Sequence, residues 1–197
     1  SYHNGQKTYN GVAIISNIKL LNVSLDLPQL TDPQKRIITG QYQSENFGLV
    51  QIVSAYVPNG QSLDSEKFQY KILWLKSFIK WTKDLLANNK HVVLTGDFNI
   101  APNDEDCHDP EQWIGKNLVS PIEREYFNKI IDNGFNDSFR FLNPNDQKFS
   151  WWDYRMAGYK RNLGMRIDHI LTSKSLKKQL FKSYIDCLLY TSDAADD

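Results

Sequence analysis

Hydrophobic and polar positions follow two periods along the chain, one typical of strands and one of helices. Apolar runs at residues 11–15 and 49–57 predict strands, and the length of the second run indicates burial on both faces. Between Asp64 and Asn88 apolar residues recur at helical spacing, and Asp64 is a suitable N-cap. A further apolar run at 92–95 follows. The sequence therefore predicts a long amphipathic helix between two buried strands.

A second helix is predicted over residues 120–134. Ser120 can cap its first turn, Glu123 can complete a capping box, and Gly134 ends it. Residues 166–173 predict another short strand. Because some predicted strands are separated by helices and others only by turns, we expect one α/β domain with a mixed sheet packed by helices in layers.

The segment VVLTGDFNIAP, residues 92–102, ends a predicted core strand with polar side chains. In an extended chain Asp97 and Asn99 share one side and Phe98 turns to the other, while Gly96 permits close approach of a second backbone. Oxygen-bearing side chains suit Mg²⁺ or Mn²⁺, and an Asn amide can donate to a phosphate oxygen. Asp, Asn and Pro are also ordinary turn formers. The segment alone is compatible with either interpretation.

Three further segments carry possible site residues. Tyr56 ends a predicted strand in SAYVPNG, where its hydroxyl could meet a phosphate or its ring could be half-buried. Asp168 lies beside Arg166 in NLGMRIDHILTS, and a carboxylate in an apolar strand is costly unless it is paired or used. Trp151 and Trp152, in FSWWDYR, suit either a core or stacking on a nucleic acid. Each of these three segments alone is compatible with a site residue and with a purely structural one.

Composition narrows the class of protein only a little. The 197 residues fit one domain, and 41% hydrophobic and 23% charged residues are ordinary for a globular protein. A formal net charge of zero provides no overall signal for nucleic acid. Cys107 and Cys187 are too few for a disulfide framework, and no apolar run reaches the length of a membrane span.

Taken together, four segments resemble one family. GDFNIAP, AYVPNG, DSFRF followed by FSWWDYR, and NLGMRIDHILTS match the exonuclease III / AP endonuclease family 1 of the endonuclease–exonuclease–phosphatase superfamily. The pattern from Asn162 to Ser173 fits a family signature throughout. A second signature, which begins at Asp137, fits with one departure, because Phe141 stands where the family usually has Lys or His.

The resemblance implies a DNase I-like fold, a four-layered α/β sandwich of two mixed β-sheets flanked by helices. It implies hydrolysis of DNA phosphodiester bonds in base excision repair with Mg²⁺ or Mn²⁺ as cofactor. The expected reactions are incision at abasic sites, 3′-to-5′ exonuclease activity and cleaning of 3′ ends. The expected partner is double-stranded DNA with abasic sites or 3′ ends. The resemblance also implies a monomer in a bacterial-type cytoplasm, with an organelle or the nucleus left open.

Individual roles are carried over from the resemblance. Tyr56 resembles the tyrosine beside the scissile phosphate, and Asp97 the acid that orients or deprotonates the attacking water. Asn99 resembles the amide that binds the phosphate, and Asp168 the acid that supports a catalytic histidine. Asp97 and Asn99 are the expected metal ligands. The residues expected to contact DNA are Arg36, Lys71, Trp151, Trp152 and Arg166, with Trp151 lining the pocket for the abasic sugar.

The same resemblance bears on the ends of the chain. It assigns residues 1–186 to the family domain, truncated at both ends, with a metal-binding Asn and Glu before Ser1 and the general-base His beyond the C-terminus. Residues 187–197, CLLYTSDAADD, look like the translation of a sequencing adapter. The chain by itself is therefore expected to have little nuclease activity.

Two other hypotheses stay open. One is a phosphatase or phosphodiesterase of the same fold that acts on a non-DNA substrate. Such relatives share the GDxN strand end, but we would not expect the pattern Asn-x-Gly-x-Arg-Ile-Asp in them. The other is a catalytically inactive fragment that binds DNA only.

Overall fold

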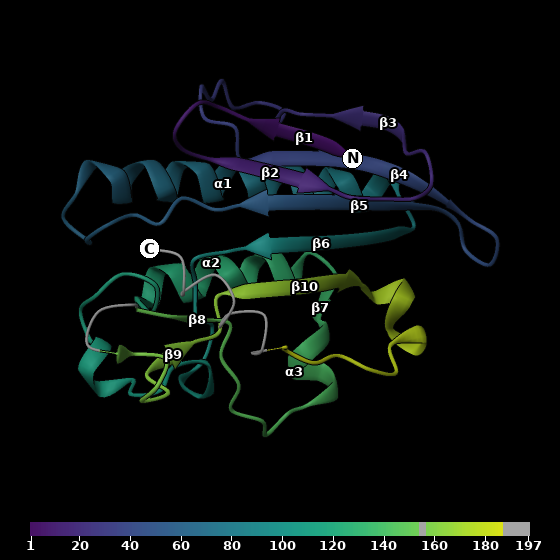
Figure 1. Cartoon of the computed structure of the whole chain (residues 1–197). Coiled ribbons are helices and arrows are strands. Elements are labelled where there is room, and N and C mark those ends of the chain that lie inside the picture. The colour runs from purple at the N-terminus through teal and green to yellow at the C-terminus, as the bar shows by residue number, and fades with distance from the viewer. Residues whose placement is uncertain (154–156, 187–197) are drawn as a thin grey trace.

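A computed structural model describes residues 1–153 and 157–186 of the chain. Six strands form one mixed sheet in the order β3-β4-β5-β6-β10-β7, and the others form two ribbons, β1-β2 and β8-β9 (Figure 1). The strands are Tyr2–Gly5 (β1), Gly11–Ile14 (β2), Leu21–Ser24 (β3), Ile37–Ser44 (β4), Gly48–Tyr56 (β5), His91–Asp97 (β6), Phe135–Asp137 (β7), Trp151–Trp152 (β8), Gly164–Met165 (β9) and Asp168–Ser173 (β10).

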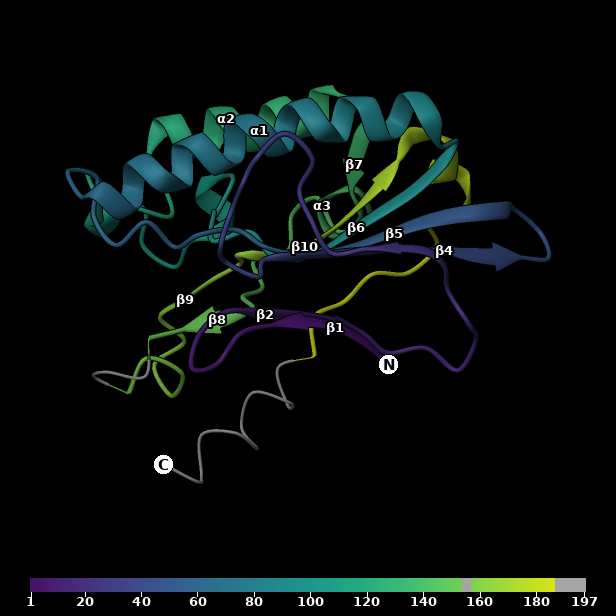
Figure 2. The same ribbon diagram turned by 90° about the horizontal axis from the view of Figure 1, so that it is seen from above.

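The α-helices are Glu66–Asn88 (α1), Pro121–Asp132 (α2) and Ser138–Leu142 (α3). Figure 2 shows α1 and α2 side by side on one face of the six-stranded sheet, with both ribbons on the other side. The expected α/β class with a mixed sheet and packed helices is confirmed. The resemblance implies a second sheet on the face opposite α1 and α2. In the described residues the strands on that side are those of the two short ribbons. In this part of the chain no helix is long and apolar enough to cross a membrane.

The chain order of β5, α1 and β6 positions the site. β5 and β6 pair in parallel, whereas the other pairs of the six-stranded sheet are antiparallel. Two parallel neighbours need a long crossover, which α1 supplies. The carboxyl ends of β5 and β6 therefore lie at the same edge, and the antiparallel β10 begins there.

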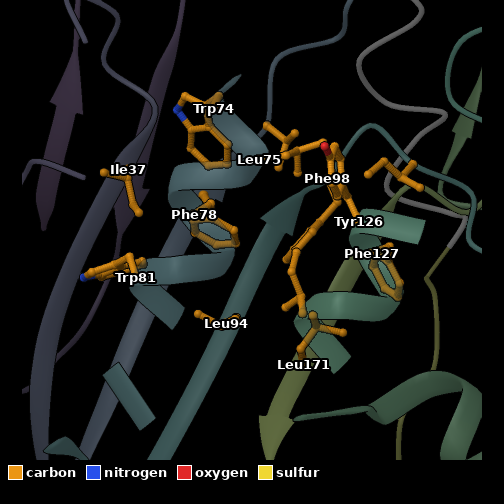
Figure 3. Packing of buried hydrophobic residues seen from close by; sticks show 14 of the residues in the cluster. Ile37, Trp74, Leu75, Phe78, Trp81, Leu94, Phe98, Tyr126, Phe127 and Leu171 are labelled. Atoms are coloured by element: carbon orange, nitrogen blue, oxygen red, sulfur yellow. The ribbon is translucent and has the colours of Figure 1, made fainter. Parts of the chain in front are cut away.

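The main core fills the space between the two long helices and the sheet (Figure 3). Trp74 and Phe78 of α1 stack with their ring centroids 4.8 Å apart, and Leu94 of β6 lies among them. Phe98 is fully buried and meets the ring of Phe127 from α2 edge-on. Phe98, which the sequence predicts to turn away from the side of Asp97, thus anchors the end of β6 in the core.

Helix and strand ends differ slightly from the predicted ones. The N-cap of α1 is Ser65 and not Asp64, because the Ser65 side chain accepts the hydrogen bond from the Phe68 amide. The capping box of α2 between Ser120 and Glu123 is confirmed. The strand predicted from residue 166 begins only at Asp168.

Candidate active site at one edge of the sheet

Three of the predicted catalytic residues lie at the same level on neighbouring strands. Asp97, which ends β6, is the register partner of Tyr56 in β5 and of Asp168 in β10. Register partners project from the same face of a sheet. That face is turned away from the helices, since Leu94 and Leu171 alternate into the helix-side core. The structure thus brings Tyr56, Asp97 and Asp168 together.

Gly96 allows β6 to reach this position. Its φ is +133°, and a Cβ built on it would lie 1.9 Å from the carbonyl oxygen of Ala55 in β5. Any other residue would therefore have to push the two strands apart just before Asp97. The predicted close backbone approach at Gly96 is confirmed.

Asp97 and Asn99 meet through a tight turn. The Asn99 backbone amide donates to Asp97 Oδ1 at 2.7 Å, and Asn99 Nδ2 lies 3.0 Å from Asp97 Oδ2. Asn99 has a φ of +50°, so the chain has left the extended conformation. The expectation that strand alternation aligns the two side chains is wrong, because β6 ends at Asp97. The segment therefore forms a turn, and the same turn holds Asp97 and Asn99 together at the candidate site.

Asn99 is surrounded by protein partners. The side chain is 3% exposed, and its Oδ1 accepts from Asn59 Nδ2 at 2.8 Å while its Nδ2 also donates to the Val57 carbonyl at 3.0 Å. These contacts hold the Asn99 amide against Asp97. Both ends of the amide thus have protein partners. The expected contact of Asn99 with a metal or a phosphate stays a prediction.

The environment of Asp97 changes its acidity. Burial, and after it the negative charge of Asp168, raises the pKa of Asp97 to about 7, although the hydrogen bonds from Asn99 act in the opposite direction. A carboxyl group that titrates near neutral pH can take up a proton from water during a reaction. The position of Asp97 therefore suits a general base.

In metal-free protein, Asp97→Asn should raise the free energy of unfolding, and the gain should grow with pH. A carboxyl whose pKa rises on folding from 3.8 to about 7 contributes stability below about pH 4 and loses it as the pH rises to about 7. An amide has no such loss, so the gain should be about 1–3 kcal/mol larger at pH 8 than at pH 4. Urea unfolding in a chelating buffer measures this. A gain independent of pH would contradict the prediction.

Lys71 does not face a DNA strand, and the expectation for it is wrong. Its side chain is fully buried between α1 and α2, where the ammonium group pairs with the Glu123 carboxylate. The same group donates to the carbonyls of Asn99 at 2.7 Å and Asn59 at 3.2 Å. Burial lowers the pKa of Lys71, and the charge of Glu123 opposes that effect. Lys71 therefore supports the Asp97–Asn99 turn from inside the molecule.

Arg166 and Trp152 are also interior residues, so the expectation that they touch DNA directly is wrong. Arg166 is 1% exposed, with Nε 2.7 Å from Asp106 Oδ1 and Nη2 2.8 Å from Asp137 Oδ2. Trp152 is 3% exposed, and its indole NH donates to Asn162 Oδ1 at 3.3 Å. Both side chains are placed in the core because partners from distant segments satisfy their polar atoms.

Arg36 and Trp151 keep positions from which a ligand could be reached. The Arg36 guanidinium stacks 4.6 Å from the Tyr56 ring centroid and donates to the Tyr56 carbonyl at 3.2 Å. Arg36 and Tyr56 line a cavity of about 560 Å³, together with Tyr9 and Lys67. Trp151 is partly buried at the start of β8. The last residues of FSWWDYR, 154 and 155, lie outside the described residues.

The site offers oxygen donors for a metal ion. Asp97 and Asp168 place two carboxylates on neighbouring strands, and such donors suit hard divalent cations. Within residues 1–153 and 157–186 no three His, Cys, Asp or Glu side chains gather as a possible metal site. Mg²⁺ is often bound by only one or two carboxylates, with water and substrate phosphates completing its shell. The donor set fits such an ion.

Three residues of this region support the site although the sequence predicted no role in it for them. Asn59 is part of an ordinary turn, and Glu123 was identified only as a helix cap. His169 lies in the matched segment from Asn162 to Ser173, but the resemblance assigned no role to it. Their roles depend on contacts with residues more than 20 positions away, which no local pattern reports.

Comparison with known proteins is consistent with this geometry. The sequence profile of the Endonuclease/Exonuclease/phosphatase family matches residues 1–193. The match runs into residues 187–193, which lie outside the described residues, so the expected foreign tail at 187–197 and the domain limit at 186 stay predictions. The chain is 35% identical over 187 residues to exodeoxyribonuclease III from Haemophilus influenzae, which covers 90% of this chain and 70% of that protein.

Two solved structures are similar over most of the chain. The structure of an AP endonuclease from Archaeoglobus fulgidus superposes with a TM-score of 0.86 at 31% identity, covering 94% of this chain and 70% of that one. A variant of the 3′ phosphatase NExo from Neisseria, bound to a product DNA hairpin, gives a TM-score of 0.83 at 39% identity. That match covers 92% of this chain and 74% of the Neisseria chain.

Proposed function

Because the chain belongs to the Endonuclease/Exonuclease/phosphatase family, alongside the exonuclease III and AP endonuclease DNA-repair nucleases, we propose that the protein containing it hydrolyses phosphodiester bonds in double-stranded DNA. The proposed reactions are incision beside abasic sites and removal of groups from 3′ ends. The family depends on a divalent metal, and we propose Mg²⁺ or Mn²⁺ for this member. The observation that carries the proposal is the alignment of Tyr56, Asp97 and Asp168 at one edge of the sheet.

The residues of the site have complementary chemical roles in this proposal. Asp97, held by Asn99, orients a water molecule and takes up its proton. The Tyr56 hydroxyl donates to a phosphate oxygen, where negative charge grows during the reaction. The Asp97 and Asp168 carboxylates would hold a divalent ion, which would neutralise more of that charge. Preset hydrogen bonds such as those of Asn99 need little rearrangement when the substrate reacts.

The surface beside these residues supports binding of a DNA strand. The cavity of about 560 Å³ contains the cationic groups of Arg36 and Lys67 and the ring of Tyr9, which is 74% exposed. Cations suit phosphates, and an exposed ring suits a sugar or a base. We propose that Arg36 contacts the strand here and that Trp151 borders the abasic sugar. The relative from Neisseria is a DNA complex, which agrees with a DNA substrate.

Cleavage of defined substrates tests the function. The full-length protein is incubated with a duplex carrying one abasic site and with a duplex carrying a 3′-phosphate, in Mg²⁺, in Mn²⁺ and in EDTA. We expect metal-dependent incision of the first and loss of phosphate from the second. Hydrolysis of sphingomyelin or a soluble phosphomonoester, with both duplexes left intact, would favour the non-DNA alternative and contradict the proposal.

A further inference from the structure

His169 lies directly behind the candidate active site. It follows Asp168 on β10, and its side chain points to the opposite, helix-covered face, where it is 3% exposed. The ring packs edge-on against Phe98, with centroids 5.4 Å apart, and lies tilted against Phe127 at a centroid distance of 4.7 Å. A buried imidazole among aromatic rings must have its two nitrogen atoms satisfied by partners.

The two partners of the His169 ring determine which nitrogen carries the proton. Nδ1 lies 3.0 Å from Nη1 of Arg166, and a guanidinium group can only donate, so Nδ1 accepts. Nε2 lies 2.9 Å from the carbonyl oxygen of Ile100, which can only accept, so Nε2 donates. The nearest Asp137 oxygen is 3.7 Å from Nδ1, too far for a competing hydrogen bond. The His169 ring therefore bridges Arg166 and the Ile100 carbonyl, accepting at Nδ1 and donating at Nε2.

Arg166 is itself held in one position. Its Nε donates to Asp106, and its two terminal nitrogens donate to the two oxygens of Asp137 at 3.1 and 2.8 Å. Asp137 also caps α3 through the amides of Phe139 and Arg140. A bidentate pair of this kind has a defined geometry. The nitrogen that Arg166 offers to His169 is thus fixed relative to α3 and the segment around Asp106.

On the other side of the ring, Ile100 belongs to the turn that carries the site. It follows Asn99 directly, and the carbonyl of Asn99 accepts from the Lys71 ammonium group at 2.7 Å. Two consecutive carbonyls of this turn are therefore bound by buried donors from different elements, Lys71 on α1 and His169 on β10. Both carbonyls lie within three residues of Asp97.

We propose that His169 is a positioning residue, which connects the buried cluster of Asp106, Arg166 and Asp137 to the Ile100 peptide and so holds the Asp97–Asn99 turn in its reactive geometry. The inference rests on the proposed hydrolysis of DNA. It does not place His169 in contact with DNA, metal or water. A misplacement of a reacting group by about 1 Å can cost roughly a hundredfold in rate.

Kinetics of matched variants of the full-length protein test this role. His169→Phe keeps a ring in the aromatic cluster but removes both hydrogen bonds, and its kcat on abasic duplex should fall about 10–100-fold with KM unchanged. His169→Gln can still accept from Arg166 and donate to Ile100, and it should restore most of the loss. The control Phe127→Leu disturbs the packing around the same ring without touching those hydrogen bonds, and its kcat should stay near that of the unaltered protein.

Spectroscopy gives a readout that does not depend on activity. The ¹⁵N chemical shifts of the His169 ring in the 197-residue chain should show a hydrogen on Nε2 and a hydrogen-bond acceptor at Nδ1. A proton on Nδ1, or equal kcat for His169→Phe and the unaltered protein, would overturn the inference. Failure of the unaltered protein to cleave DNA would instead count against the proposed function, while the shifts would still decide how His169 is bonded.

Discussion

Replacing Lys71 by methionine should lower the free energy of unfolding by about 3–5 kcal/mol. Lys71 and Glu123 are both fully buried, and without the ammonium group the Glu123 carboxylate would be left as an uncompensated charge in the core. The carbonyls of Asn59 and Asn99 would lose a donor as well. Urea denaturation should show this as a lower midpoint with an unchanged slope.

Two variants separate the charge effect from the loss of a long side chain. Adding Glu123→Gln to Lys71→Met removes the unpaired charge, so the double variant should recover part of the lost stability. Lys129→Met breaks an exposed ion pair with Glu125 on α2 and should change stability very little. A loss below about 1 kcal/mol for Lys71→Met would contradict the buried pair described above.

Asp97→Asn should reduce kcat on abasic duplex by about 1000-fold, within the range that general-base catalysis supplies. The amide keeps the size of the side chain but cannot take up a proton from water. Binding of DNA should be retained, because the variant removes a negative charge from a surface that meets phosphates. Single-turnover cleavage with excess enzyme measures the chemical step, and a gel-shift titration in EDTA measures binding.

The control for this loss is Asp132→Asn. Asp132 is an exposed acid at the end of α2, so the variant makes the same chemical change away from the site and should cleave at the normal rate. A kcat for Asp97→Asn within tenfold of the unaltered enzyme would mean that another group activates the water. Asp97→Asn is thus expected to lose activity and, without metal, to gain free energy of unfolding. The two results together would show that the ionised Asp97 serves the reaction and destabilises the fold.

Local patterns predicted the elements of the fold well. Apolar spacing identified β5, α1 and β6, and the capping box of α2 was visible in Ser120 and Glu123. These features depend on residues at most a few positions apart, which is the range over which helix and strand periods act. The predicted ends were less accurate, as Ser65 shows, because neighbouring polar residues compete to cap a helix.

The site was predicted only in part from the chain. Asp97 and Asn99 were identified as a pair, but the sequence suggested strand alternation as the cause, whereas a turn with positive φ at Asn99 brings them together. Lys71 was expected to meet DNA because its position resembles a family position that faces the substrate strand. Its burial depends on Glu123, 52 residues further along the chain, and no local pattern contains that distance.

The sequence alone determined the secondary-structure elements and the family resemblance. It also placed an acid and an amide, Asp97 and Asn99, at the end of a core strand. All of these are properties of short segments. The tertiary structure decided that Tyr56, Asp97 and Asp168 share one register line, since strand pairing joins segments that lie far apart in the chain. It also decided that Arg166 is a buried support and not a DNA contact. A charged side chain can be buried when folding brings partners to it, and its partners Asp106 and Asp137 come from two other segments.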